Sequence, residues 1–160
     1  MALQKITIKE YKLEDTQDLA KIYYNTIHKV NIKHYTEEQV NVWAPDTSLE
    51  VSGWAKKFER TKPFVAIIDN MIVGFAEFEP DGHIDCFYCH HKWIGYGVGS
   101  ALMQIIHENA IQKGIKLIFS EVSITALPFF KKYGFTTITE QTIVRQGVQL
   151  INYKMEKHLL

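Results

Sequence analysis

The middle of the chain consists of short apolar runs that are separated by turn residues. Residues 64–68 and 71–78 read FVAII and MIVGFAEF, and only Asp69-Asn70 separates them. Two residues of this type between strand-like runs are typical of a tight hairpin turn. Pro80-Asp81-Gly82 then turns the chain again into residues 83–89. The sequence therefore predicts an antiparallel meander of three strands, which any fold of this chain has to contain.

Glycine occupies every second position shortly after this meander, at Gly95, Gly97 and Gly99, and a helix over about residues 98–113 follows. Where side chains are missing, backbone amides can crowd around an anion, and the helix N-terminus adds its positive end. The spacing differs from the G-x-G-x-x-G of dinucleotide-binding folds, and no Gly-Lys-Ser/Thr follows, as a Walker loop requires. We predict a phosphate or pyrophosphate site that is built mostly from backbone.

The other segments alternate between strand and helix periodicity. We predict strands at residues 6–8, 116–120, 136–144 and 148–155, and helices from Asp15 or Thr16 to Val30, from Thr36 to before Pro45, near 49–60 and at 126–133. No linker rich in proline or glycine interrupts this order. We expect one domain, residues 1–160, of the α/β (α+β) class, with a mixed, mostly antiparallel sheet of about seven strands flanked by helices.

Composition excludes several classes of partner. The formal net charge is +0, so a general electrostatic affinity for nucleic acid or for an anionic membrane is not expected. The apolar runs are strand-sized, and Met1–Lys5 contains no apolar signal core. We therefore expect a cytoplasmic protein whose two cysteines are reduced thiols.

Those cysteines, Cys86 and Cys89, stand next to His90 in the C-x-x-C-H spacing of covalent haem attachment, and His91 adds another metal-ligand type. Haem attachment is not expected, because alternation along a strand points the two cysteines to opposite faces. A structural zinc site normally draws on two pairs of ligands, and the remaining histidines have no such spacing. We predict neither haem nor metal, with buried thiols and histidines in a solvated loop.

Two segments resemble the acyl-coenzyme A-dependent N-acetyltransferases of the Gcn5-related (GNAT) superfamily: HIDCFYCHHKWIGYGVGSALM, residues 83–103, and SITALPFFKKYGF, residues 123–135. HYTEEQVNVWA, residues 34–44, and VRQGVQLINYKM, residues 144–155, are further similar to a subgroup of small bacterial members. The resemblance implies a V-shaped opening between the fourth strand and the fifth, with acetyl-coenzyme A as cosubstrate.

The resemblance also implies where the cofactor binds. Pantetheine is expected to add to the strand backbone, and pyrophosphate to meet the loop amides, through Phe87, Tyr88, Cys89, Ile94, Gly95, Tyr96, Gly97, Val98, Gly99, Ser100, Ser123 and Phe130. Three of these positions depart from the family pattern. Ile94 replaces a usual Gln or Arg, Ser123 replaces a frequent Asn, and Phe130 replaces the Tyr that often protonates the departing thiolate. Tyr133 is the nearest alternative acid.

For the base, the family commonly uses a carboxylate on the fourth strand or a relayed water. Asp85 is the first candidate, because a charged residue inside an apolar strand has to face solvent, a partner or a cleft. His83, Glu77 and Glu79 are alternatives, and Asp85 has a second interpretation as a charge that positions the substrate without moving protons.

Two mechanisms and two functions remain open. Direct transfer in a ternary complex is favoured over an acetyl-enzyme on a cysteine, which needs an activating base. We expect transfer to a primary amine of a small molecule or peptide, and the alternative is a coenzyme A-binding module with weak or no catalysis. The acceptor-binding candidates are Tyr24, His34, Tyr35 and Trp43, together with Tyr23, and core packing is the other interpretation of these aromatic residues. Both a monomer and a homodimer fit the sequence.

Overall fold

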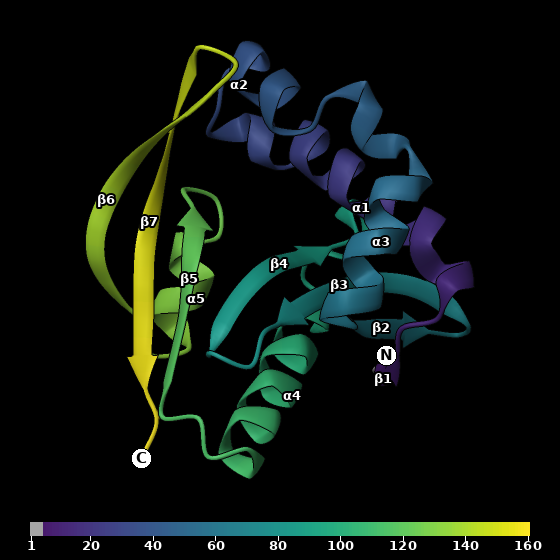
Figure 1. Ribbon diagram of the computed structural model, residues 1–160, viewed down its shortest axis with the longest axis vertical. Coiled ribbons are helices and arrows are strands. Elements are labelled where there is room, and N and C mark those ends of the chain that lie inside the picture. Colours follow the sequence, from purple (N-terminus) through teal and green to yellow (C-terminus); the bar gives the residue numbers. More distant parts are fainter. Residues whose placement is uncertain (1–4) are drawn as a thin grey trace.

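Seven strands form one mixed sheet in the order β1-β2-β3-β4-β5-β7-β6 (Figure 1). The computed structural model describes residues 5–160, so the expectation about the N-terminal segment falls largely outside it. The strands are β1 (Thr7–Glu10), β2 (Phe64–Ile68), β3 (Met71–Phe78), β4 (His83–Cys89), β5 (Leu117–Ser123), β6 (Thr136–Arg145) and β7 (Val148–His158). The β4–β5 pair is parallel and the other five pairs are antiparallel, which confirms the predicted sheet.

The predicted meander is present as β2, β3 and β4. Asp69 and Asn70 both have positive φ, +49° and +64°, at the turn between β2 and β3. A two-residue hairpin turn with this backbone twist matches the twist of its strands, and Asp and Asn tolerate it better than other side chains. The turn dipeptide thus fixes the register in which Ile68 faces Met71.

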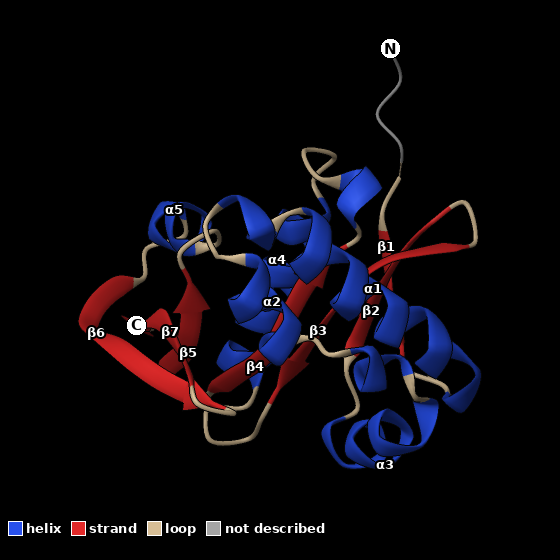
Figure 2. Cartoon of the chain, turned by 90° about the horizontal axis from the view of Figure 1, so that it is seen from above, coloured by secondary structure: helices blue, strands red, loops and turns tan. Residues whose placement is uncertain are grey.

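Helices lie on both faces of the sheet, with α3 on one side and α5 on the other (Figure 2). The helices are α1 (Thr16–Lys29), α2 (Glu37–Trp43), α3 (Val51–Thr61), α4 (Val98–Gln112) and α5 (Leu127–Lys132). The capping residues predicted for α2 do cap it: Thr36 Oγ1 accepts from the Gln39 amide at 3.1 Å, and the Thr36 amide donates to Gln39 Oε1 at 2.9 Å. No helix within residues 5–160 is long and apolar enough to span a membrane.

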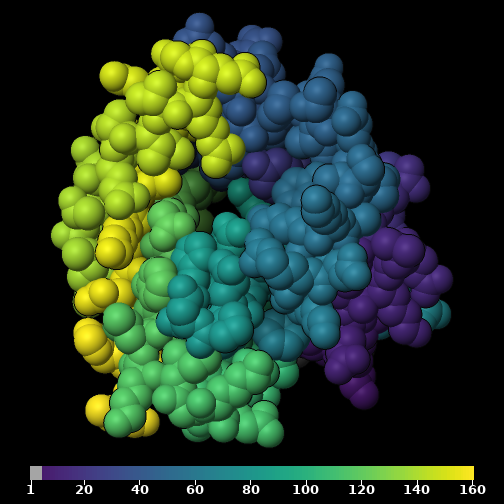
Figure 3. Space-filling view, viewed as in Figure 1, coloured from purple at the N-terminus to yellow at the C-terminus, as the bar shows by residue number. Residues whose placement is uncertain are grey.

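The sheet opens between β4 and β5. These strands pair only at His83 with Phe119 and at Ile84 with Ser120. Next to this pairing, two β4 residues, Asp85 and Cys86, oppose a single residue of β3, which is the arrangement of a β-bulge. A bulge bends its strand and redirects its side chains. The predicted V-shaped splay is therefore present, and an opening lies between the yellow β6–β7 hairpin and the blue helices (Figure 3).

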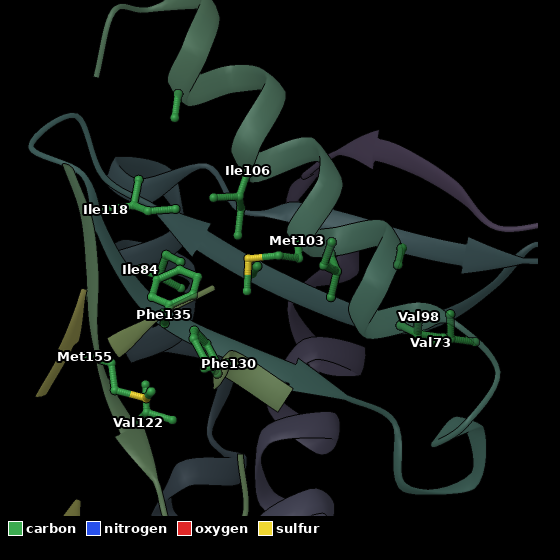
Figure 4. Packing of buried hydrophobic residues seen from close by; sticks show 14 of the residues in the cluster. Val73, Ile84, Val98, Met103, Ile106, Ile118, Val122, Phe130, Phe135 and Met155 are labelled. Atoms are coloured by element: carbon green, nitrogen blue, oxygen red, sulfur yellow. The ribbon is translucent and has the colours of Figure 1, made fainter. Parts of the chain in front are cut away.

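Two apolar cores, one on each face, hold this open sheet together. On one face, Met103 and Ile106 of α4 point towards Ile84, Ile118 and the α5 side (Figure 4). On the other face, α1, α2 and α3 bury Leu19, Ile27, Val40, Phe58 and Phe75. Each core contains residues from both sides of the β4–β5 opening, so packing on the two faces connects strands that do not pair with each other there.

Candidate functional site

Two cavities meet where β4 and β5 separate. The larger one, about 570 Å³, is lined along its outer part by residues 94–100, and we call it the loop cavity. The smaller one, about 300 Å³, is lined by the β6–β7 hairpin and by α1 and α3, and we call it the hairpin cavity. Five residues line both cavities: Trp43, Asp85, Tyr88, Glu121 and Ser123. We call these five shared residues the junction.

The glycine loop leads directly into the first turn of α4. Gly95 and Gly97 have φ values of +87° and +90°, a backbone region that residues other than glycine rarely adopt. Gly97 is the residue just before the helix. A Cβ atom on Gly99 would lie 3.0 Å from the Phe129 ring, so a larger residue would require this ring to shift. The first amides of a helix have no intrahelical acceptor. Together with the helix dipole they form a site for an anion.

The structure brings the predicted cofactor residues together around the loop cavity. All of them except Tyr96 contribute to its lining, and the Tyr96 side chain is exposed at the rim. Ser123 Oγ accepts hydrogen bonds from the Ala126 amide at 3.1 Å and from Asn31 Nδ2 at 3.4 Å. Its own hydroxyl proton is therefore available to a third group at the junction.

Phe130 of α5 and Tyr133 at its end have different surroundings. Phe130 is buried in the cavity wall, with its ring centroid 5.5 Å from that of Phe87. Tyr133 lies outside the lining of the loop cavity, and its hydroxyl donates to Ser100 Oγ at the start of α4. The structure thus does not bring Tyr133 together with Asp85 at the junction.

Asp85 belongs to a charged group that reaches from the junction into the core. Lys57 Nζ lies 2.9 Å from a carboxylate oxygen of Asp85 and 2.9 Å from one of Glu77. Glu77 is fully buried and also accepts from Thr61 Oγ1 at 2.6 Å. Burial opposes the charged form of Lys57, but Cys86, Glu77 and Asp85 around it together raise the pKa of Lys57. Asp85, with 38% of its side chain exposed, is fixed by this contact in a position that faces both cavities.

The same group contains the ligand types of a metal site. The ligand atoms of Glu77, Asp85 and Cys86 lie within 4.8 Å of one another, and within residues 5–160 no other three metal-ligand side chains cluster in this way. Lys57 Nζ, 3.7 Å from Cys86 Sγ, already supplies positive charge to all three. A metal ion here would have to displace that ammonium group.

A second carboxylate at the junction, Glu121, was missed in the sequence analysis. His83 Nε2 lies 2.7 Å from Glu121 Oε1, and His83 Nδ1 lies 2.7 Å from Glu79 Oε1. The hydrogen bond to Glu121 raises the pKa of His83 to about 9, against the opposing effect of burial, and the bond to Glu79 adds to it. Glu121 is the single charged residue of β5, the same signal that identified Asp85 on β4.

The acceptor candidates divide into two groups. Tyr35 and Trp43 line the hairpin cavity, and so does Tyr23. Tyr24 and His34 are outside both linings: the Tyr24 hydroxyl donates to Asp46 at 2.8 Å, and His34 Nδ1 lies 2.9 Å from Thr125 Oγ1. Trp54 also lines the hairpin cavity, and the sequence analysis did not single it out.

The two cysteines pack on opposite faces of the sheet, as the strand alternation predicts. Cys86 is buried in the core under α1–α3, whereas Cys89 packs against the core under α4. Burial raises the pKa of Cys89 to about 12 and raises that of Cys86 as well. Both therefore remain thiols at neutral pH, which is a poor state for a nucleophile.

Comparison with known proteins agrees with this geometry. The family model described as an acetyltransferase (GNAT) domain matches residues 31–157. The chain is 29% identical to the uncharacterized N-acetyltransferase YafP of Escherichia coli K12, over 96% of each chain. A GCN5-related N-acetyltransferase structure from Rhodopseudomonas palustris matches with a TM-score of 0.92 and 27% identity, over 99% of both chains.

The PaiA N-acetyltransferase of Thermoplasma acidophilum, solved in complex with coenzyme A, matches with a TM-score of 0.75. It is 17% identical and the match covers 97% of this chain and 99% of that one, so it supports the fold. The family model covers most of the chain, and the sheet has the parallel β4–β5 pair and the splay that the resemblance implies. The chain therefore belongs to the GNAT family of acetyltransferases.

Proposed function

We propose that the protein transfers the acetyl group of acetyl-coenzyme A to a primary amine of a small molecule or peptide, by direct attack in a ternary complex. The observation that carries this proposal is the junction, where an anion-binding loop cavity meets a second cavity beside two carboxylates. In the reaction the amine nitrogen bonds to the acetyl carbon and the carbon–sulfur bond breaks. The amine loses one proton, and the sulfur leaves as the thiolate or thiol of coenzyme A.

The loop cavity fits coenzyme A at both of its ends. The amides of residues 95–100 would hold the pyrophosphate, because the positive φ of Gly97 and the close packing of Gly99 expose backbone there. The pantetheine would lie along the edges of β4 and β5 that no longer pair with each other, beyond Ile84 and Ser120. The thioester would then reach the junction.

Asp85 is the proposed proton acceptor. Its contact with Lys57 fixes the carboxyl group at the junction, where it can orient the amine and take up a proton as the new bond forms. An amide of β4 near Tyr88 or Cys89, on the side that β5 leaves open, would stabilise the developing oxyanion. Glu121 is the second acidic side chain in position to act, and its contact with His83 fixes it there.

The leaving thiolate has no Tyr hydroxyl at position 130. We propose that the Ser123 hydroxyl, whose oxygen already accepts two hydrogen bonds, donates its own proton as a hydrogen bond to the sulfur. The buried thiols of Cys86 and Cys89 support direct transfer rather than an acetyl-enzyme, since neither is ionised at neutral pH.

The absence of a hydroxyl at Phe130, together with the bond from Tyr133 to Ser100, favours one alternative: a coenzyme A-binding module with weak or no catalysis. Release of free thiol from acetyl-coenzyme A, measured across a panel of amines, separates the two functions. Thiol release that depends on the amine supports the enzyme. Tight coenzyme A binding without release by any amine supports the module.

The variant Asp85→Asn tests the assignment of the base. We expect its turnover number to fall by about 100-fold, the usual size of a general-base contribution, with coenzyme A affinity unchanged. Asp69→Asn, the same chemical change in the exposed β2–β3 turn, serves as the matched control. If Asp85→Asn turns over as fast as the control, Asp85 is not the base.

A further inference from the structure

Aromatic side chains form a substantial part of the walls of the hairpin cavity. Five aromatic side chains line it: Tyr23, Tyr35, Trp43, Trp54 and Tyr88. Their rings hold one another edge to face, with centroids 4.8 Å apart for Tyr23–Trp54, 5.1 Å for Tyr23–Tyr88 and 5.1 Å for Tyr35–Trp43. Rings fixed in this way present rigid flat surfaces, which favour a flat, apolar ligand body.

The charged residues of this cavity form two groups. At the junction, Asp85 and Glu121 are already paired, with Lys57 and His83. Arg145, the last residue of β6, also lines the cavity, and within residues 5–160 no carboxylate lies within ion-pair distance of its guanidinium. A guanidinium without an acidic partner at a ligand cavity is suited to bind a carboxylate.

The cavity is also closed on one side. Tyr35 donates to the carbonyl oxygen of Ile151 at 2.7 Å, and Gln39 Nε2 donates to that of Gln149 at 2.8 Å. These bonds tie the α2 region to β7 and leave a volume of about 300 Å³. That volume is at the lower end of the range for small-molecule sites.

We propose that the acceptor is a small aromatic amine that also carries an acidic group, such as an amino acid with an aromatic side chain. The amine would lie at the junction, the ring between the aromatic walls and the acidic group at Arg145. The four charged side chains of the lining, Lys57, Asp85, Glu121 and Arg145, sum to zero, which suits a zwitterion rather than a polycation. This inference rests on the proposed function, because it names the acceptor of that reaction.

The first test compares four amines as acceptors by thiol release. L-phenylalanine has ring, amine and carboxylate, phenethylamine lacks the carboxylate, L-leucine lacks the ring, and spermidine lacks both. We expect kcat/KM for phenylalanine to exceed that for each of the others by about tenfold or more, a difference that an Arg–carboxylate contact or a filled aromatic pocket can supply. Equal or better turnover of leucine or spermidine overturns the inference about the acceptor, but it does not contradict the proposed acetyltransferase activity.

The variant Arg145→Gln tests the acidic group directly. It should lower kcat/KM for phenylalanine more than kcat/KM for phenethylamine and so remove the preference between them, and Arg145→Lys should restore part of that preference. Arg60→Gln is the matched control, because Arg60 lies on α3 outside both linings. A preference that survives in Arg145→Gln contradicts the proposed contact.

Calorimetric binding of L-phenylalanine to the coenzyme A complex separates the two proposals. Binding that Arg145→Gln weakens, without any thiol release, supports the ligand class and contradicts the acetyltransferase. Thiol release with other amines, together with no binding of phenylalanine, contradicts the ligand class alone. If neither binding nor release occurs, both proposals fail.

Discussion

Ionisable side chains at the junction are each held by a partner from another part of the chain. Asp85 is paired with Lys57 of α3, and Glu121 of β5 is paired with His83 of β4. Charges on otherwise apolar strands are costly unless they are paired or solvated. Here each pair fixes one acidic side chain in the lining that the two cavities share.

The His83 pair makes a prediction about pH and stability. The pKa of His83 is raised from 6.5 to about 9, first by the hydrogen bond to Glu121, so folding is favoured by the protonated ring. This stabilisation is complete below pH 6.5 and is lost as the pH rises through 9. We expect the Tm difference between wild type and His83→Gln to shrink over that range. His158→Gln removes an imidazole at an exposed position and serves as the control. If the Tm difference between wild type and His83→Gln does not change with pH, the pairing of His83 with Glu121 is contradicted.

Single residues were predictable from the sequence where their own strand marked them. Asp85 was selected because it is charged within an apolar strand, and its cavity position agrees with that reasoning. His34 was selected for its aromatic character, but it contacts Thr125, 91 residues away, and such a partner has no local signal. The pairing of Lys57 with Glu77 and Asp85 could not be predicted either, because α3, β3 and β4 meet only in the folded chain.

At the scale of elements, α4 connects the loop to the core. Its N-terminal turn presents amides to the loop cavity, while Leu102, Met103 and Ile106 anchor the helix in the buried face. The 15-residue length of α4 places a full helix dipole behind the proposed anion site. The loop geometry is therefore stabilised by packing one to two turns further along the helix.

The pair Gly97→Asp and Gly114→Asp tests this element. Both glycines have positive φ, +90° and +71°, and both flank α4, but only Gly97 lines the loop cavity. Both substitutions should cost about 1 kcal/mol of stability, from the same backbone strain. Calorimetry should find coenzyme A affinity reduced by more than about tenfold in Gly97→Asp, by charge repulsion and crowding, and unchanged in Gly114→Asp. Equal affinities in the two variants would contradict the pyrophosphate assignment.

Most elements could be predicted because their signals are local. The Asp69-Asn70 turn, the Thr36 cap and the periodicity of α1 each depend on a few neighbouring residues. β5 is longer than predicted and continues to Ser123, because β7 pairs with it along its whole length. That pairing partner lies about 30 residues further along the chain, where the sequence of β5 alone gives no indication of it.

For the whole molecule, the segment from the end of α1 to α2 bridges the two halves of the open sheet. Asn31 contacts Ser123, His34 contacts Thr125, and the buried Tyr35 hydroxyl accepts from the Ile124 amide at 2.9 Å while donating to Ile151. β4 and β5 pair over only two residue pairs, so these contacts supply much of the connection across the splay. The same contacts close one side of the hairpin cavity.

The variant Tyr35→Phe tests this bridge. It removes two hydrogen bonds, those to the Ile124 amide and to the Ile151 carbonyl, which should lower the free energy of unfolding by about 1–3 kcal/mol. It should also raise KM for the acceptor, with coenzyme A affinity unchanged, because Tyr35 lines the hairpin cavity and not the loop cavity. Denaturant unfolding and steady-state kinetics measure both effects. Tyr24→Phe, which loses a hydrogen bond to Asp46 at an exposed site, is the control. If Tyr35→Phe lowers the free energy of unfolding no more than Tyr24→Phe does, the segment does not act as a bridge.

The family could be predicted from the strand order and the glycine loop, but the arrangement of residues around the hairpin cavity could not. The hairpin cavity draws on α1, α3, β4 and both strands of the last hairpin, and its shape depends on how these elements pack. Trp54 lies outside the segments that resemble the family, and Arg145 lies within residues 144–155 but has no signal of its own there. The relation of both residues to the site depends on how the hairpin packs against the helices.

A crystal structure of the protein with coenzyme A tests the central claim most directly. The account predicts pyrophosphate on the amides of residues 95–100, pantetheine between β4 and β5, and the sulfur at the junction beside Asp85, Glu121 and Ser123. Coenzyme A bound elsewhere, or with its sulfur outside the junction, would contradict it.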